Sequence, residues 1–233
     1  MFRFARSQTF VADEIRPRPF IYLTSIYLYS CLIYGLRYSI IVDKLKQINN
    51  LEYMESHKQL RGVELKRFVR INKIKKDFEL ILILLNLSYA TNVAAIFRLA
   101  DAFSVDKMFL VGCTTTPPFG KAMKSVSRGK EDSVHWEYAE TFENTVVKLK
   151  KQDFQIYGLE LASEAKPIND LSSRKVKKVA LVVGNEEHGI PDKHLLLMDD
   201  VFYIPMGGKG KSLNVSNTTG IGLYQITVGS NLS

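Results

Sequence analysis

The feature of this sequence that most constrains its fold is a regular alternation of strand and helix patterns after residue 77. Residues 78–85, FELILILL, form an apolar run interrupted only by Glu79, which is typical of a strand buried on both faces of a parallel sheet. A helical pattern follows and ends near Ser104. Further strands are expected at 107–111, 135–138, 155–160, 179–183 and 200–204, and helices at 142–152, at 193–198 and after Ser212. This alternation predicts an α/β domain with a mostly parallel sheet and helices on both faces.

Ligands of such sheets bind at the carboxyl ends of the strands, and three distinctive segments lie at such ends. The first, residues 86–101, reads NLSYATNVAAIFRLAD and places Asn92 at the start of a helix and Arg98 further along it. Six residues apart, the two side chains should lie on different faces of the helix, although Asn92 near the N-terminus can turn back toward the strand end. Arg98 among apolar neighbours is either a snorkelling surface residue or a functional one.

The second segment, residues 182–191, reads VVGNEEHGIP and ends a buried strand at a glycine. Gly184 permits close approach of a ligand, and Glu186 supplies hydrogen-bond acceptors at the mouth of the sheet. Glu187 and His188 have the composition of a solvated turn. No second His or Cys lies at ligand spacing from His188, so no metal is expected.

The third segment, residues 204–216, reads IPMGGKGKSLNVS and runs into an apolar helix. Residues 207–210 permit backbone conformations with positive φ, which would let main-chain groups cradle a polar ligand. The unpaired N–H groups at the start of the following helix attract negative charge. The alternative is a solvated turn in which Ser212 is the helix N-cap.

Composition narrows the class of protein. The 233 residues carry a formal net charge of +8, which favours a polyanionic partner such as nucleic acid. The two cysteines, Cys31 and Cys113, have neither CxxC nor His spacing, so a reducing compartment, the cytoplasm, is expected. The absence of GxGxxG after the first strand, GxxxxGK(S/T), GxSxG and HExxH counts against a Rossmann dehydrogenase, a P-loop NTPase, an α/β-hydrolase and a zincin.

The chain is predicted to have three parts: an apolar extension at 1–53, a basic helical lead-in at 54–77 and an α/β domain at 78–233. Within the extension, residues 20–42 carry Arg37 as their only charge. This stretch is a membrane anchor, a targeting leader, or a segment that packs on the domain or is foreign to it; its uncharged part is at the short limit of a membrane span. Met54 is a plausible alternative start.

Together, the strings NVAAIFRLADAF, LVVGNEEHGIP and IPMGGKGKSLNVSNTTGIGLYQI resemble the three motifs of the SpoU (TrmH-type) branch of the SPOUT RNA 2′-O-ribose methyltransferases. The similarity spans about residues 78–228. It implies a C-terminal deep trefoil knot, S-adenosylmethionine as methyl donor, and a homodimer with its active site at the subunit interface. It also implies methyl transfer to a ribose 2′-hydroxyl of tRNA or rRNA. The chain lacks room for the L30e-like domain of many rRNA-modifying relatives, which favours tRNA.

The resemblance carries roles to individual residues. Arg98 matches the catalytic arginine, Asn92 an asparagine that organises it, and Glu186 the glutamate of the second motif. Ser212 and Asn214 match the pair of the third motif near the reacting groups. The resemblance places the adenosyl group against six further residues: Leu159, Glu160, Gly184, Ile204, Met206 and Leu213.

Two roles stay open for Arg98. A guanidinium has an ordinary pKa above about 12, so it is a weak base unless its surroundings lower that value strongly. Arg98 therefore either removes the hydroxyl proton with help from an RNA phosphate or binds that phosphate and orients the hydroxyl.

Three positions depart from the family pattern: Ala94 and Ser104 stand where glycine is usual, and Leu99 where threonine or serine is usual. The polar site residues are all present, so an active enzyme is expected. The alternative is a catalytically inactive, knotted RNA-binding protein.

Overall fold

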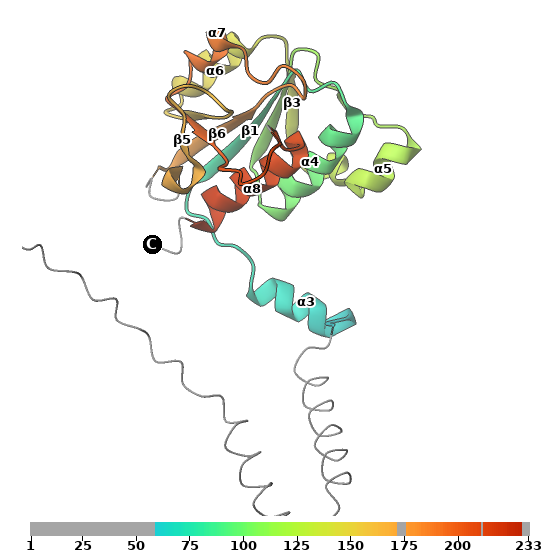
Figure 1. Ribbon diagram of the computed structural model, residues 1–233. Coiled ribbons are helices and arrows are strands. Elements are labelled where there is room, and N and C mark those ends of the chain that lie inside the picture. Colours follow the sequence, from blue (N-terminus) through green and yellow to red (C-terminus); the bar gives the residue numbers. More distant parts are fainter. Residues whose placement is uncertain (1–58, 172–175, 211, 230–233) are drawn as a thin grey trace, which may run out of the picture. The chain divides into compact units, whose positions relative to one another are not determined.

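The computed structural model describes residues 59–171, 176–210 and 212–229 (Figure 1). The chain divides into two compact units, 1–71 and 72–233. The predicted extension at 1–53, with its apolar stretch 20–42 and Met54, lies outside the described residues. In the part of the chain that the structure describes, no helix is long and apolar enough to cross a membrane.

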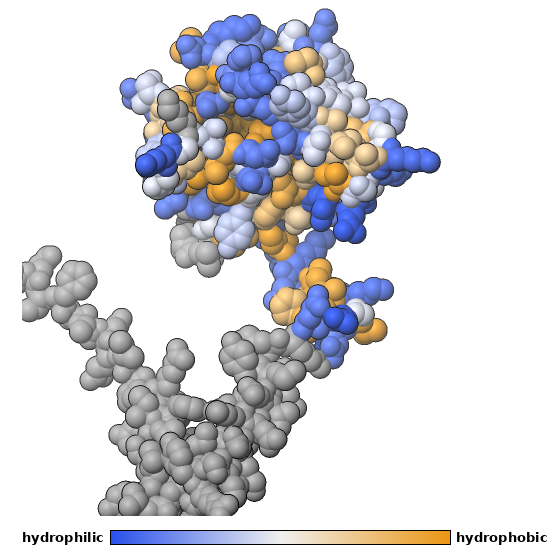
Figure 2. Space-filling view, turned by 45° about the vertical axis from the view of Figure 1, so that its right-hand side comes forward, coloured by the Kyte–Doolittle hydropathy of each residue, from blue (hydrophilic) through white to orange (hydrophobic). Residues whose placement is uncertain are grey.

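The described part of the first unit contains helix α3, Gly62–Ile71, which lies within the predicted lead-in at 54–77. All of its residues are exposed, including the apolar Val63 and Phe68. Figure 2 shows apolar surface in orange on this helix.

The described part of the second unit is built on a seven-stranded sheet in which every pair of neighbours is parallel. From one edge to the other, the strands are β3 (Trp136–Ala139), β2 (Lys107–Val111), β1 (Glu79–Leu85), β6 (Lys178–Val183), β4 (Gln155–Leu159), β7 (Asp200–Tyr203) and β5 (Lys166–Pro167). The predicted parallel α/β fold is confirmed.

Strand β1 shows why the sheet is covered on both faces. Leu80, Leu82 and Leu84 belong to one buried cluster, whereas Ile81 and the alternate residues after it belong to a second. Because successive strand side chains point to opposite faces, a run that is apolar at every position requires a covering layer on each side.

Helices supply both layers. Helix α4 (Ala90–Ala102), helix α8 (Val215–Thr227) and the 3₁₀ turn η2 (Ile168–Leu171) contribute to the first cluster. Helices α6 (Phe142–Lys150) and α7 (Asp192–Leu195) pack on the second. Figure 1 shows α4 and α8 side by side, with α5 (Lys121–Ser127) beside α4; the short turn η1 (Lys130–Asp132) follows α5.

The predicted strands agree with the observed ones to within a residue or two, but three details differ. The short elements β5 and η2 were not predicted, because two strand residues ending in proline carry no periodic pattern. Helix α7 stops at Leu195 and not at 198. Helix α8 begins at Val215, and its N-cap is Asn214, whose Oδ1 accepts a hydrogen bond from the Ser216 amide at 2.8 Å.

Candidate cofactor and active site

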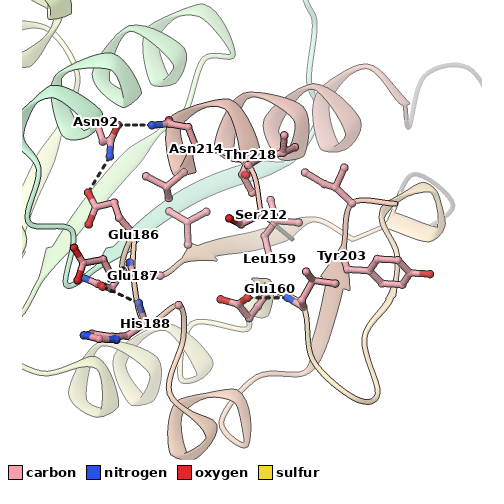
Figure 3. Close-up of a pocket in the computed structure, with 18 of the residues that line it drawn as sticks. Asn92, Leu159, Glu160, Glu186, Glu187, His188, Tyr203, Ser212, Asn214 and Thr218 are labelled. Carbon is pink, nitrogen blue, oxygen red and sulfur yellow. Dashed lines mark hydrogen bonds between the residues drawn. The ribbon is translucent and has the colours of Figure 1, made fainter. Parts of the chain in front are cut away.

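A cavity of about 570 Å³ opens at the carboxyl ends of strands β4, β6 and β7, beside the first turns of α4 and α8 (Figure 3). Drug-sized ligands occupy pockets of roughly 300 to 1,000 Å³. The cavity is lined by Tyr89, Asn92, Leu159, Glu160, Leu161, Val183, Gly184, Asn185, Glu186, Glu187, His188, Gly189, Tyr203, Ile204, Met206, Ser212, Leu213, Asn214, Val215 and Thr218. Residues from all three predicted segments therefore meet at one site.

The loop after β6 forms one wall and depends on two glycines. Gly189 has φ +62°, a left-handed conformation that favours glycine. Gly184 packs against it, since a Cβ added to Gly184 would lie 2.4 Å from the carbonyl carbon of Gly189. Asn185 closes the turn, because its Oδ1 accepts hydrogen bonds from the amides of Glu187 and His188 at 2.9 and 3.0 Å. Gly184 thus serves the packing of this loop as well as the cavity wall.

Glu160, at the end of β4, anchors the same loop from the opposite side of the cavity. Its Oε2 accepts a hydrogen bond from the Ile190 amide at 3.0 Å, and its Oε1 accepts one from the Leu161 amide at 2.8 Å. A Cβ on Gly189 would lie 2.3 Å from Glu160 Oε2. The carboxylate is therefore held in place by main-chain groups and fixes the distance between two walls.

A chain of three polar side chains joins the three segments (Figure 3). Asn214 Nδ2 donates to Asn92 Oδ1 at 3.0 Å, and Asn92 Nδ2 donates to Glu186 Oε1 at 3.0 Å. The amides of Ser88 and Tyr89 also donate to Glu186, each at 3.2 Å. Asn92 is 8% exposed, so its amide is oriented by partners on both sides. Asn92 can therefore fix the relative positions of α4, α8 and the β6 loop.

These hydrogen bonds set the protonation of Glu186. Burial raises the pKa of its carboxyl, but hydrogen bonds from the Asn92 side chain and from backbone amides outweigh burial, and the pKa lies below the ordinary value of 4.5. Glu186 is therefore a carboxylate at neutral pH.

The lowered pKa predicts an acid-dependent contribution to stability. A carboxyl whose folded pKa is depressed contributes stability that is present above its unfolded pKa and is lost as pH falls through the folded pKa. Glu186→Gln should therefore be less stable than wild type at pH 7, with a difference that shrinks below about pH 4.5. Urea unfolding at pH 7, 5 and 4 measures this, with the exposed Glu140→Gln as control. A difference that stays constant across this range would contradict it.

The third segment, residues 204–216, adopts a conformation that differs in part from the one its glycine-rich composition predicted. Ile204, Met206, Ser212 and Leu213 line the cavity as expected. The predicted glycine cradle at 207–210 is wrong for this structure: none of its glycines has positive φ, all are exposed, and none lines the cavity. Neither does Ser212 cap α8, because Asn214 takes that position.

Arg98 does not lie at the cavity of its own chain. It is exposed on α4 and lines a separate groove between α4 and α8, with Ile221 and Tyr224. Its Nη1 donates to the Val126 carbonyl at 3.5 Å, a long hydrogen bond. The spacing of Asn92 and Arg98 predicted this separation of faces, so only Arg98 of the predicted site residues stands apart.

Several lining residues were missed by sequence reasoning. Tyr89 spans from α4 to the β6 loop, where its hydroxyl donates to Glu187 at 2.9 Å; this hydrogen bond raises the pKa of Tyr89. Tyr203 and Thr218 also line the cavity. An isolated tyrosine or threonine carries no sequence signal, whereas Asn185 after a strand and before a turn is a recognisable turn former.

The chemistry of the lining residues fits S-adenosylmethionine. Leu159, Ile204 and Leu213 offer apolar surface to an adenosyl group, and the carboxylates Glu160 and Glu186 favour a positively charged sulfonium. The described residues contain no group of three His, Cys, Asp or Glu side chains that could hold a metal ion.

Comparisons with known proteins agree with this arrangement. The family model described as the SpoU rRNA Methylase family matches residues 79–224. The tRNA (guanosine(18)-2′-O)-methyltransferase of Aquifex aeolicus (strain VF5) is 33% identical over 165 residues, which cover 69% of this chain and 75% of that protein.

Two solved structures are also similar. The crystal structure of the A. aeolicus TrmH/SpoU tRNA modifying enzyme has a TM-score of 0.58 and 28% identity, covering 70% of this chain and 80% of that one. The AdoMet-bound rRNA methyltransferase from Sinorhizobium meliloti has a TM-score of 0.57 and 26% identity, covering 65% of this chain and 56% of that one. This chain belongs to the SpoU rRNA methylase family.

Proposed function

We propose that this protein transfers a methyl group from S-adenosylmethionine to a ribose 2′-hydroxyl of structured RNA, with tRNA preferred over rRNA. The observation that carries this proposal is the Asn214–Asn92–Glu186 chain, which joins all three segments at one cavity of suitable size. The tRNA preference is supported by the A. aeolicus relative, which is named for tRNA.

S-adenosylmethionine, when bound, supplies an electrophilic methyl group on a sulfonium. Leu159, Ile204, Met206 and Leu213 would hold its adenosyl part, together with the main chain at Gly184. Asn92 and Asn214 orient each other and Glu186, and Ser212 offers a hydroxyl at the same rim. These residues would bind and position the reacting groups, since the polar chain is already fixed by hydrogen bonds.

Arg98 acts as a phosphate-binding residue in this proposal. Its guanidinium is exposed, and its hydrogen bond to Val126 leaves further donors free for bidentate contact with an RNA phosphate. Such a contact would orient the ribose hydroxyl for in-line attack.

Arg98 lies away from the cavity of its own chain and lines a separate groove between α4 and α8. We therefore propose a homodimer in which Arg98 of the partner subunit reaches the cavity. The groove beside Arg98 supports this proposal, since Ile221 and Tyr224 of α8 are 39% and 50% exposed there. Burying such apolar surface is what stabilises subunit association.

The homodimer predicts the effect of Ile221→Glu. A buried charge at a subunit interface should yield a monomer that retains S-adenosylmethionine binding but loses at least tenfold in methyl transfer, a ratio equivalent to about 1.4 kcal/mol. Analytical ultracentrifugation and a transfer assay measure both. Leu196→Glu is the matched control, because Leu196 is 85% exposed next to α7, on the other layer. A fully active monomer would contradict the shared site.

A C-terminal trefoil knot is the finer part of the fold proposal. It is supported by the sheet order, in which β7 lies between β4 and β5, and by the packing of α8 against η2. The cytoplasmic location likewise stays a prediction.

The function is tested by incubating the full chain with methyl-labelled S-adenosylmethionine and either bulk tRNA or bulk rRNA, followed by mapping of 2′-O-methyl positions. Isothermal titration measures cofactor binding separately. Label in the ribose of tRNA supports the proposal. RNA binding without cofactor binding or transfer would instead identify an inactive RNA-binding relative.

A further inference from the structure

Arg128 has a backbone conformation that suits other residues better. Among the described residues, the non-glycine positions with positive φ are Asn86, Ser104, Arg128 and Asp153. Asparagine and aspartate tolerate the left-handed region because their short side chains bond locally, and serine is also short and polar. Arg128, at φ 57° and directly before Gly129 at φ 70°, has no such advantage. An arginine held in a strained conformation points to a use for its side chain.

Arg128 ends helix α5, and a second cation begins it. Lys121 and Arg128 are both exposed, and neither has an ion pair within the described ranges. The two lysines between and after them are paired: Lys124 lies 3.4 Å from Asp132, and Lys130 lies 2.9 Å from Asp101. The free positive charges of this region therefore lie at the two ends of α5.

Contacts between α4 and α5 place the Arg128 end of α5 at Arg98 and the Lys121 end near Asn92. The carbonyl of Val126, two residues before Arg128, accepts the hydrogen bond from Arg98. At the other end of α5, Met123 Sδ lies 3.5 Å from the Oγ1 of Thr91. Thr91 directly precedes Asn92, which lines the cavity. Figure 1 shows α5 lying along the outer side of α4. Lys121, Arg98 and Arg128 thus form one exposed cationic surface, here called the α5 surface.

We propose that the α5 surface binds backbone phosphates of the RNA substrate on either side of the methylated nucleotide. This inference rests on the proposed function and extends it to named residues. Lys121 and Arg128, at the two ends of α5, have no ion pair among the described residues, so they can bind phosphate without first breaking one. Two of the three are arginines, whose planar fork fits a phosphate with two parallel hydrogen bonds. A flexible RNA backbone passing Arg98 would meet these groups next.

The test compares the double variant Lys121→Gln/Arg128→Gly with Lys151→Gln. Lys151 is a matched control, because it is exposed, unpaired among the described residues and located at the end of α6 on the other layer. Binding of unmodified bulk tRNA is measured at several salt concentrations, and S-adenosylmethionine binding by isothermal titration. The double variant should weaken tRNA binding at least tenfold and reduce the slope of log K against log salt by about 0.7 to 0.9 for each phosphate that it no longer binds.

The thermal stability of the double variant shows whether misfolding causes its loss of tRNA binding. Glycine adopts the left-handed conformation of position 128 without strain, so the thermal midpoint should stay the same or rise while tRNA binding falls. Cofactor binding and the Lys151→Gln control should match wild type. Unchanged tRNA affinity and salt slope in the double variant, with an active wild type, would overturn the α5 surface and leave the proposed function standing. A wild type that methylates no RNA would overturn the proposed function itself.

Discussion

Arg98→Ala should lower methyl transfer to RNA at least tenfold, and should leave S-adenosylmethionine binding unchanged. A tenfold loss corresponds to about 1.4 kcal/mol of transition-state stabilisation. The side chain is exposed, lies outside the cavity and makes one long hydrogen bond to Val126, so its removal takes little from folding or from the cofactor site. Single-turnover rates at saturating RNA measure the first effect, and isothermal titration the second. Transfer above a tenth of the wild-type rate would remove Arg98 from the catalytic residues.

Two companion experiments refine this result. Arg98→Lys keeps the charge but loses the bidentate fork, so a partial recovery over alanine indicates phosphate binding by charge and geometry.

Mixing Arg98→Ala subunits with subunits whose cavity is damaged tests the shared site. If Arg98 serves the partner's cavity, heterodimers contain one complete site and regain activity that neither variant has alone. No recovery in mixed dimers would place Arg98 and its cavity in one subunit.

The fold was largely predictable because its strands are buried on both faces. An apolar run such as 78–85 is compatible with few structures other than a buried strand, and the strand was predicted to within one residue of its observed bounds. Parallel pairing followed from the helices between strands. The sequence could not predict β5, whose two residues pair with β7 only through tertiary contact. It also could not choose between Ser212 and Asn214 as the cap of α8, since both are good N-cap residues.

The site was predictable where it depends on strand ends and less so where it depends on loop conformation. Asn92, Glu186 and Asn214 meet because parallel strands bring their ends to one edge. The glycines at 207–210 can adopt positive φ, but a glycine need not do so, and none of these glycines has positive φ in the structure. Gly189, in the other loop, does adopt positive φ and was not singled out. Glycine composition alone therefore did not show which loop forms the cavity wall.

The contrast between the two glycine loops gives the second large prediction. Gly184→Ala should weaken S-adenosylmethionine binding at least tenfold and lower the thermal midpoint. The added Cβ would lie 2.4 Å from the carbonyl carbon of Gly189 and 2.6 Å from its oxygen, which are backbone atoms that no rotamer change can move. Overpacking of this kind costs about 1 to 3 kcal/mol, and each kcal/mol lowers the midpoint of a domain this size by roughly 2 to 4 °C.

Gly210→Ala is the matched control for this experiment, because no heavy atom lies within 4 Å of its added Cβ and its φ is not positive. It should bind cofactor and melt like wild type. The pair separates two hypotheses about the cofactor site. If the β6 loop forms the wall, affinity falls only in Gly184→Ala, since the turn closed by Asn185 and Gly189 must move away from Glu160. If the glycine-rich segment at 207–210 holds the cofactor instead, Gly210→Ala loses affinity and Gly184→Ala affects only the melting temperature.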